Sequence, residues 1–483
     1  MTVPTDAVLT ALAELLGPRG LTTDPDLLEP WLTDWRGRFT GRARALVSPG
    51  STAEVAEIVR ICAAHGVPIV PQGGNSGMCG GATPDESGAA VLLSLRRLNT
   101  IEPVNTDARQ VTCGAGTILE TLHDAAAAAG LRFPLTLGGK GSATVGGLVS
   151  TNAGGTQVLR HGSMRSLVLG LEAVLADGTV FSALTPLKKD NRGFDLKQVL
   201  IGSEGTLGIV TAATLRLVPA VADRVVVWAG LSSLQRARAL LLACEDRLGA
   251  GVEGFEVMPA SSVAAVLAYD PGTRAPLSGD HPWHVLMEVV ADAGSAADLR
   301  ERVEAAVAEA FEAGLIDDAV LSSGEAQAEA LWRIREAIPS AERAHGPAVQ
   351  HDISVPVDRM PDFVDAMVAE VEQAFPGVRA IAFGHLGDGN VHFHALAPSG
   401  TEGAPWYAAT GKAISALVHD RVVEWAGSIS AEHGIGQLKR DELERLGDPA
   451  ALALMRTIKR ALDPAELLNP GKLVALAPSG PTA

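Results

Sequence analysis

The sequence is poor in cysteine and in aromatic residues. Its 483 residues include four cysteines, and phenylalanine, tryptophan and tyrosine together make up 4%. So few aromatic rings leave little material for stacking the bases of a single-stranded nucleic acid. The cysteines show neither the paired spacing of a metal site nor a dense disulfide framework, so we expect small core residues and a reducing compartment. They are Cys62, Cys79, Cys113 and Cys244.

Positive charge and long apolar runs are also scarce. The 39 lysines and arginines are outnumbered by 56 aspartates and glutamates, which gives a formal net charge of -17. This balance argues against nucleic acid or an anionic membrane as a partner, because both require a basic surface. Residues 1–17 lack the basic and apolar regions of a secretory leader, and no later run is long and apolar enough to span a bilayer. We therefore expect a cytoplasmic protein with no transmembrane segment.

The length and the hydrophobic content indicate a globular protein of two or three domains. A chain of 483 residues exceeds one compact core, and 47% hydrophobic residues predict extensive burial. Near the N-terminus, a capping box that begins at Ser51 predicts a helix that ends at Gly66 and leads into a buried strand over 67–70. Further along, Asp177 and Gly178 between two strand-like runs are typical of a hairpin turn.

The pattern changes at about position 220. Over 220–426, strand-like and helix-like runs alternate, which predicts an α+β domain with helices on one face of a mostly antiparallel sheet. The strands of this domain are expected at 225–229, 252–257, 285–290, 348–355 and 378–383. The remaining segment, 427–483, is too short for a domain and is expected to pack back on the first domain, 1–219.

Two glycine-rich stretches predict a cradle for an extended cofactor. In the first, 71–81, consecutive glycines let backbone amides approach an anion closely. This stretch has neither the lysine of a P-loop nor the dinucleotide fingerprint. The second, 137–155, supplies more small residues, which can wrap a long, flat molecule whose pyrophosphate lies on the first loop. Taken alone, 71–81 could equally be a flexible loop.

The segment 383–394 predicts a metal site. Its glycine-rich turn is followed by residues that alternate with the period of a strand, which puts His392 and His394 on one face. A tight reversal after His385 brings that ring near His392, so two imidazoles can share one cation. The alternative is a strand that carries ordinary surface histidines.

Two adjacent residues in the C-terminal segment extend this candidate site. Glu432 offers a carboxylate that would complete a set of two imidazoles and one oxygen ligand. Its neighbour His433 is a candidate proton acceptor. A candidate ligand therefore lies next to a candidate base.

Together these stretches resemble the FAD-linked oxidoreductases of the vanillyl-alcohol oxidase and p-cresol methylhydroxylase type. Within that group the sequence is most similar to the bacterial D-2-hydroxyglutarate dehydrogenase and D-lactate dehydrogenase branch. The matching passages span nearly the whole chain and lie at 71–81, 137–155, 170–179, 190–197, 201–209, 384–392, 431–436 and 462–472. The resemblance implies FAD held in extended form between two α+β subdomains of 1–219. It also implies a cap domain for the substrate at 220–426, and a C-terminal segment that completes the active site.

The resemblance further implies which residues contact the cofactor. The pyrophosphate loop would be lined by Gly73, Gly74, Asn75, Ser76, Gly77 and Met78. The rest of the cofactor would be lined by Leu137, Gly141, Ser142, Thr144, Gly147, Asn152, Gly154, Ile209 and Asn469. Relatives that attach FAD covalently often do so through a histidine. This loop has none, and His161 looks like an ordinary loop residue, so we expect non-covalent FAD.

For the chemistry, the resemblance implies that a divalent metal, expected to be zinc, is held by His385, His392 and Glu432, and that His433 is the catalytic base. Arg335 matches the arginine that binds the substrate carboxylate. A guanidinium suits this role, because it can pair a carboxylate through two parallel hydrogen bonds. The alternative for Arg335 is an arginine on a helix surface.

The sequence departs from the hydroxyglutarate enzymes at three positions. Pro339 stands where they commonly carry threonine, Gln350 where they carry lysine, and His394 where many carry asparagine. Gln350 and His394 are therefore candidate substrate-binding residues. The loss of the lysine leaves the substrate open between D-2-hydroxyglutarate and a D-lactate-like acid.

The expected reaction is oxidation of a D-2-hydroxy acid to the 2-keto acid by hydride transfer to the flavin. Two alternatives are a metal-free flavin oxidase that uses oxygen and a flavin-binding protein without catalysis. The sequence does not name the electron acceptor, for which an electron-transfer flavoprotein and a quinone are both candidates. It also leaves open whether the protein is a homodimer.

Overall fold

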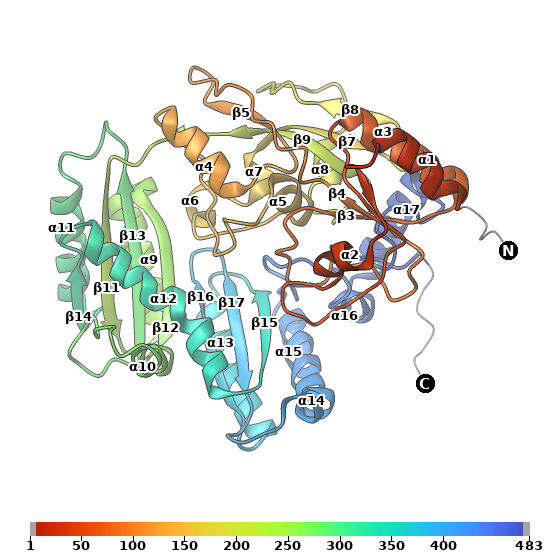
Figure 1. Cartoon of the computed structure of the whole chain (residues 1–483). Helices are drawn as coiled ribbons and strands as arrows, with labels where there is room; N and C mark the ends of the chain where they lie inside the picture. Colours follow the sequence, from red (N-terminus) through yellow and green to blue (C-terminus); the bar gives the residue numbers. More distant parts are fainter. Residues whose placement is uncertain (1–5, 477–483) are drawn as a thin grey trace. The chain divides into compact units, whose positions relative to one another are not determined.

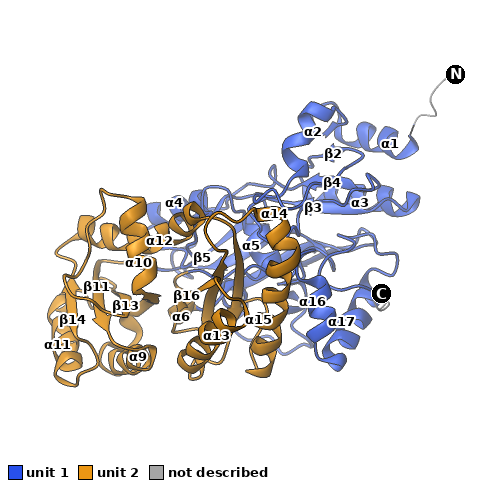
Figure 2. Cartoon of the chain, turned by 90° about the horizontal axis from the view of Figure 1, so that it is seen from below, with its two compact units in different colours: residues 1–155, 162–219, 432–483 blue, residues 156–161, 220–431 orange. Residues whose placement is uncertain are grey.

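The computed structural model describes residues 6–476, which fold into two compact units (Figures 1 and 2). Unit 1 comprises 1–155, 162–219 and 432–483, and unit 2 comprises 156–161 and 220–431. Unit 1 is thus assembled from three stretches of the chain, with most of unit 2 inserted between the second and the third.

The division differs from the expected one at two places. The short stretch 156–161 belongs to unit 2, where the Arg160 guanidinium bonds to Glu253 at 2.9 Å. The C-terminal boundary lies after residue 431 and not after 426, because Ser428 and Ser354 exchange two backbone hydrogen bonds at the edge of the sheet of unit 2.

Unit 1 contains two four-stranded sheets and a two-stranded ribbon. The first sheet has the order β1-β2-β4-β3, in which β2, β3 and β4 are parallel and β1 is antiparallel. Its strands are β1 Leu21–Thr22, β2 Leu46–Val47, β3 Ile69–Gln72 and β4 Val91–Ser94. The second sheet, β5-β9-β7-β8, is antiparallel. Its strands are β5 Gln110–Gly114, β7 Val168–Val174, β8 Val180–Ala183 and β9 Ile209–Arg216, and the ribbon pairs β6 Leu131–Arg132 with β10 Val218–Pro219.

Helix α3 (Thr52–His65) positions the strand that leads into the first glycine-rich loop. The predicted cap is confirmed, because the Ser51 hydroxyl accepts the Glu54 N–H and Gly66 takes a left-handed conformation with φ of 64°. Apolar side chains of α3 enter one core cluster together with those of β3 and β4. This packing fixes the direction of β3 and therefore the position at which the first glycine-rich loop begins.

Unit 1 contains eight further helices among its described residues. They are α1 Ala7–Leu16, α2 Pro25–Leu32, α4 Leu119–Ala128, α5 Val145–Thr151, α7 Met164–Leu167, α8 Lys197–Leu200, α16 Arg440–Leu446 and α17 Pro449–Leu462.

Unit 2 is built on one antiparallel sheet of seven strands, in the order β14-β11-β13-β12-β16-β17-β15. The strands are β11 Asp223–Leu231, β12 Val252–Pro259, β13 Trp283–Ala291, β14 Asp318–Leu321, β15 Ala348–Ser354, β16 Arg379–His385 and β17 Asn390–Leu396. The helical elements are α6 Val158–His161, α9 Leu234–Leu248, a 3-10 turn Gly249–Gly251, α10 Ala260–Tyr269, α11 Leu299–Glu312, α12 Glu325–His345, α13 Met360–Ala374, α14 Gly403–Trp406, a π-helical turn Tyr407–Gly411 and α15 Lys412–Glu424.

The expectation that helices cover one face of this sheet is wrong. On one face, Trp228, Leu286 and Phe383 share a core cluster with residues of α10 and α12. On the other, Val227 and Met287 are also buried, and α9, α11 and α13 pack there (Figure 2). Nearly all residues of the central strands β12 and β13 are buried, because a strand that is covered on both sides has no solvent-facing residues.

The four cysteines are buried and free of disulfides. Burial raises the pKa of the thiols of Cys62, Cys113 and Cys244 to about 12, so these three remain protonated at neutral pH. Among the described helices, none combines the length and the apolar character needed to cross a bilayer.

Candidate active site

The two glycine-rich stretches lie against each other in unit 1. A Cβ atom added at Gly73 would meet the Thr144 hydroxyl at 2.2 Å, and one added at Gly74 would meet the Ser142 carbonyl oxygen at 1.8 Å. Both positions therefore require glycine for contact between the two stretches. Gly77 is different, because a Cβ there would meet nothing within 4 Å. Its open side is available to a ligand.

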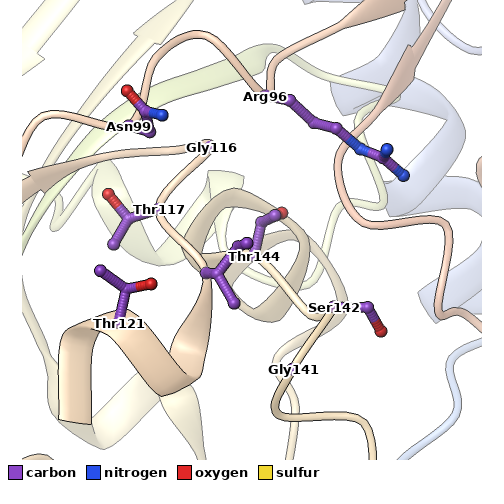
Figure 3. Close-up of a pocket in the computed structure, with 9 residues that line it drawn as sticks. Arg96, Asn99, Gly116, Thr117, Thr121, Gly141, Ser142 and Thr144 are labelled. Atoms are coloured by element: carbon purple, nitrogen blue, oxygen red, sulfur yellow. The ribbon is translucent and has the colours of Figure 1, made fainter. Parts of the chain in front are cut away.

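A cavity of about 250 Å³ lies beside these stretches. It is lined by Arg96, Asn99, Gly116, Thr117, Ile118, Thr121, Gly141, Ser142 and Thr144 (Figure 3). Arg96 also braces the first loop, since its Nε donates to the Gly73 carbonyl at 3.1 Å and its Nη2 to the Gly74 carbonyl at 3.4 Å. A cation is thereby fixed beside the loop that we predict to hold a pyrophosphate.

The cradle fits an extended, anionic cofactor. The Thr144 hydroxyl is buried and has no hydrogen-bond partner among the described residues, although it belongs to the wall of the cavity. A ligand that reaches this wall would satisfy it. The loop is held in shape by Asn75, which has a φ of 55° and donates from Nδ2 to the Thr33 carbonyl. A glycine-rich loop whose backbone N–H groups can face an anion, with Arg96 beside it, suits a pyrophosphate.

Three other residues predicted to contact the cofactor have evident structural roles. The Asn152 side-chain oxygen accepts from the Ser163 hydroxyl and from the Arg165 N–H. Ile209 is in the core at the start of β9. Asn469 is buried and donates from Nδ2 to the carbonyls of Gly81 and Glu204. Contact of these residues with a cofactor stays a prediction, as it does for Ser76, Met78, Leu137, Gly147 and Gly154.

The predicted pair of histidines meets in the hairpin of β16 and β17. The rings of His385 and His392 have centroids 5.5 Å apart and are nearly perpendicular. His392 lies opposite Phe383 on β16 and opposite Asp352 on β15, which places these three side chains on one face of the sheet. The tight reversal after His385 is therefore confirmed.

A buried carboxylate that the sequence analysis missed connects two predicted site residues. Glu256 on β12 is fully buried, and its Oε2 accepts from Arg335 Nε at 2.7 Å. Its Oε1 lies 2.5 Å from His385 Nδ1. Burial alone would raise the pKa of Glu256, but Arg335 and His385 hold it well below its usual range. Glu256 therefore orients the His385 ring through Nδ1.

A second missed carboxylate, Asp352, faces His392. Its Oδ1 lies 3.9 Å from His392 Nδ1 and accepts from Asn390 Nδ2 at 2.9 Å. Burial, followed by the positive charge of Arg335 and by His385, holds the pKa of His392 well below its usual value. A neutral imidazole is the form that binds a metal ion.

Glu432 and His433 follow directly on Ala431, whose N–H donates to the Asp352 carbonyl at 3.4 Å. Candidate ligand atoms of His385, His392 and Glu432 all lie within 4.8 Å of one another. Those of Asp352, Glu432 and His433 form a second such group. Two imidazoles with one carboxylate match the donor set of catalytic zinc sites, which keep a coordination position open.

Arg335 is held with its terminal nitrogens unpaired. It lies on the buried face of α12 and is 8% exposed, which rules out the alternative of a surface arginine. Its guanidinium carbon lies 4.9 Å from the centre of the Phe383 ring, and Nε is occupied by Glu256. Neither Nη1 nor Nη2 bonds to any described residue. Both are thus available to a carboxylate.

The two remaining candidate substrate-binding residues lie on neighbouring strands, Gln350 on β15 and His394 on β17. Gln350 lies opposite His394 in the register. His394 Nδ1 forms a short contact with Glu342 Oε2 from α12, and the His394 ring packs edge-on against Phe383 at 5.1 Å. Glu342, which the sequence analysis missed, is fully buried.

Comparisons with known proteins show the family to which the chain belongs. Residues 43–183 match the FAD binding domain family, and 221–473 match the family of FAD linked oxidases, C-terminal domain. The second match alone covers more than half of the chain. The protein belongs to the FAD-linked oxidases. It is therefore an FAD-dependent oxidoreductase, as the resemblance implied.

Relatives of this flavoprotein align over nearly its full length. D-2-hydroxyglutarate dehydrogenase of Xanthomonas citri pv. viticola is 38% identical over 97% of this chain and 97% of the relative. The mitochondrial enzyme of that name from Bos taurus is 38% identical over 96% of this chain and 83% of the relative. A putative mitochondrial D-lactate dehydrogenase of Schizosaccharomyces pombe is 33% identical, over 94% and 86% of the two chains.

Solved structures show the same fold. The flavoprotein superposes on p-cresol methylhydroxylase with a TM-score of 0.72 at 16% identity, over 96% of each chain. It superposes on alkyldihydroxyacetonephosphate synthase with a TM-score of 0.70 at 16% identity, over 96% of this chain and 84% of the other. The predicted fold class is confirmed: an FAD-binding domain of the vanillyl-alcohol oxidase type with an α+β cap on an antiparallel sheet.

Proposed function

We propose that this flavoprotein is a metal-assisted dehydrogenase of D-2-hydroxy acids. The observation that carries the proposal is the hydrogen bonding and burial of Arg335. Its guanidinium is buried, is fixed at Nε by Glu256, and has two terminal nitrogens that bond to no described residue. The same carboxylate contacts the candidate metal ligand His385. Glu256 thereby connects an arginine that can bind a carboxylate with a histidine that is a candidate metal ligand. This arrangement suits a substrate with a hydroxyl next to its carboxylate.

The candidate metal ligands are His385, His392 and Glu432. When bound, a divalent ion such as zinc supplies Lewis acidity that lowers the pKa of the substrate hydroxyl. Glu256 orients His385 for this role, and the low pKa of His392 keeps its imidazole neutral. The ion and its identity are part of the proposal.

Arg335 would bind the C1 carboxylate through Nη1 and Nη2. This pairing orients C2, because two parallel hydrogen bonds fix the plane of the carboxylate. His433 would accept the proton of the 2-hydroxyl. Asp352, whose carboxylate lies within 4.8 Å of the His433 ring nitrogen, would orient that imidazole. FAD supplies the hydride acceptor. The product is the 2-keto acid.

We further propose that FAD is held without a covalent bond. His161, the nearest candidate for a histidyl link, lies with Nε2 3.5 Å from the buried carboxylate of Glu253 in unit 2. The loop 71–81 contains no histidine. The electron acceptor, an electron-transfer flavoprotein or a quinone, the cytoplasmic location and a homodimeric state stay predictions.

Anaerobic mixing with a panel of D- and L-2-hydroxy acids tests the function. We expect D-acids to bleach the oxidised-flavin absorbance and L-acids to leave it unchanged. If no 2-hydroxy acid bleaches the flavin, the protein is a flavin-binding protein without this catalysis and the proposal fails. If bleaching is undiminished after removal of metal with a chelator, the metal-free alternative holds. Rapid reoxidation of the reduced flavin by air would favour an oxidase over a dehydrogenase.

A further inference from the structure

One passage over which the sequence resembles its relatives, 190–197, contains none of the residues predicted to contact cofactor, metal or substrate. It belongs to the connection between β8 and α8 in unit 1 (Figure 1). Every residue from 187 to 196 is exposed, and Phe194 is 93% exposed. A folded chain gains free energy by burying such a side chain, so its exposure indicates a surface that something else covers.

Exposed apolar side chains are concentrated around this passage. Of the fifteen large apolar residues that are exposed in the described part of the chain, five lie within 180–199. They are Val180, Leu187, Phe194, Leu196 and Val199. Single exposed apolar residues need no explanation, whereas a group of them in one segment is typical of a binding surface.

Residues 185–194, which we call the strap, are joined to the rest of the fold only through their two ends. Among the described residues, no hydrogen bond or ion pair connects the strap to a residue outside it. Within it, the Arg192 guanidinium pairs with the Asp190 carboxylate, while Lys188 and Lys189 have no partner. A segment with so few bonds can change its position without breaking the fold.

The C-terminal end of the strap is anchored beside the cofactor cradle. Arg165 Nη1 donates to the Gln198 carbonyl at 2.7 Å, and the Arg165 backbone N–H donates to Asn152 Oδ1 at 2.9 Å. Asn152 directly follows helix α5, and Thr144, directly before that helix, belongs to the wall of the cavity. The seven residues of α5 span roughly 10 Å. Phe194 is four residues from Gln198, so its backbone stays within roughly 14 Å of this anchor. The strap is therefore within reach of a cofactor that is held in the cradle.

FAD offers the groups that the strap leaves without partners. Its isoalloxazine ring is flat and largely apolar, which suits the exposed ring of Phe194. Its pyrophosphate is negatively charged, which suits the ammonium groups of Lys188 and Lys189. An anionic membrane or an acidic protein has similar chemistry, but neither accounts for the anchor beside the cradle.

We propose that the strap folds over bound FAD and contributes Phe194, Lys188 and Lys189 as further cofactor-binding residues. This inference goes beyond the proposed function, because it depends on neither the substrate nor the metal. It requires only the FAD that membership of the family implies. The apoprotein then exposes apolar side chains that the FAD-loaded protein covers, and FAD leaves only when the strap opens.

Limited trypsin digestion of the full chain tests this closure. Trypsin cleaves after lysine and arginine, so the strap offers it Lys188, Lys189 and Arg192. We expect cleavage at these sites to be slower in FAD-loaded protein than in apoprotein by a factor on the order of ten or more, since cleavage follows the population of the open segment. Arg274, which is exposed in the irregular segment between α10 and β13, is the internal control. It should be cleaved at the same rate in both forms, and mass spectrometry of the fragments gives each rate.

Two results of the digestion would overturn the inference. Equal cleavage of the strap with and without FAD would leave it as a surface for another macromolecule. Equal protection of the strap and of Arg274 would mean that FAD stabilises the whole fold and that the strap has no part in it. Neither result bears on the proposed function, which is tested by bleaching of the flavin with 2-hydroxy acids.

Variants of the FAD-loaded protein test the same inference without the apoprotein. Phe194→Ser should raise the rate of FAD dissociation by a factor on the order of ten, because the cofactor loses an apolar cover. Phe311→Ser, which alters a phenylalanine that is 57% exposed in unit 2, is the matched control and should keep the wild-type rate. The double change Lys188→Glu and Lys189→Glu should also accelerate dissociation, most of all at low salt, whereas Lys412→Glu on exposed α15 should not. The rise of flavin fluorescence after dilution measures the rate. If neither change in the strap alters it, the strap is not part of the cofactor site.

Discussion

Glu204 Oε1 accepts the backbone N–H of Ile435 at 2.7 Å, although the two residues are 231 positions apart in the chain. Oε2 accepts the N–H of Gly436 at the same distance. Burial raises the pKa of Glu204, whereas these two N–H groups and the nearby lysines Lys439 and Lys472 favour its charged form. One buried carboxylate of unit 1 therefore fixes the backbone directly after the candidate base.

Because of these two hydrogen bonds, we expect a substitution at Glu204 to change both the free energy of unfolding and the rate of flavin reduction. Glu204→Ala leaves two buried N–H donors without an acceptor, which should cost roughly 2–5 kcal/mol of unfolding free energy. It should also slow flavin reduction, because His433 is two residues from the released backbone. Denaturant unfolding and single-turnover reduction measure the two effects. Exposed Glu102→Ala is the control. If the Glu204→Ala variant is as stable as the wild type, the hydrogen bonds from Ile435 and Gly436 contribute little to the free energy of unfolding.

The two loop glycines should respond differently to substitution. Gly77→Val places bulk on the open side of the loop, so the apoprotein should fold while FAD affinity falls. Gly74→Val should instead destabilise the apoprotein, since its Cβ would overlap the Ser142 carbonyl. Thermal unfolding of apoprotein and flavin titration separate the two outcomes. Full flavin occupancy in Gly77→Val would count against this loop as the pyrophosphate site.

Substitutions in the candidate metal site should separate ligands from base. His385→Ala or His392→Ala should abolish metal binding and turnover while the flavin remains, because the cradle lies in unit 1. His433→Ala should keep its metal and reduce flavin more slowly by a factor on the order of a hundred or more. Elemental analysis and stopped-flow spectroscopy provide the readouts.

Glu432→Ala is the internal control for this series. It lies next to His433 but is expected to lose the metal, as the histidine variants do. If Glu432→Ala retains metal and His433→Ala loses it, the two roles are reversed. If neither substitution slows flavin reduction, the segment is not at the active site.

Glu256 is not a candidate metal ligand, but it contacts both Arg335 and His385. We therefore expect a substitution at Glu256 to change metal affinity. Glu256→Gln keeps the size of the side chain but removes the charge that faces His385 and Arg335. Metal affinity should fall about 10–100-fold, the usual range for loss of a carboxylate behind a ligating histidine. Competition with a chromogenic chelator measures it. Glu288→Gln, which alters a buried acid bonded to Arg224 and Trp332, should leave metal affinity unchanged.

The mode of flavin attachment has a simple readout. Acid precipitation should release all flavin into the supernatant, because the candidate loop has no histidine and His161 faces Glu253. Cys79, the thiol within the loop, is buried with Sγ 3.2 Å from the Gly434 carbonyl. Yellow colour that stays with the precipitate would refute non-covalent binding.

Local signals in the sequence were sufficient for much of the fold and for part of the site. The cap at Ser51, the stop at Gly66 and the reversal after His385 depend on residues close to one another in the chain, and the structure contains all three. The two histidines of the hairpin could be paired for the same reason. Arg335 was found through resemblance to a family motif, and its burial confirms that it is not a surface residue.

The site residues that the sequence analysis missed are brought into the site by the pairing of strands that are distant in the chain. Glu256 reaches His385 because β12 pairs with β16, and Asp352 faces His392 because β15 pairs with β17. Neither pairing can be deduced from periodicity. Glu342 could have been suspected, since it follows Arg335 by seven residues and so shares its face of a helix. Pro339 lies within that interval, and α12 continues through it.

The discontinuity of unit 1 has a consequence for biosynthesis. Strand β3, which precedes the first glycine-rich loop, has its edge completed by Leu467 and Leu468, and Asn469 ties Gly81 to Glu204. These residues are synthesised after the whole of unit 2. The sheet of unit 2 is nearly continuous in sequence and can form earlier. The cofactor would therefore be acquired only after the segment that follows unit 2 has been synthesised, and nascent chains that stop before this segment would accumulate as colourless protein.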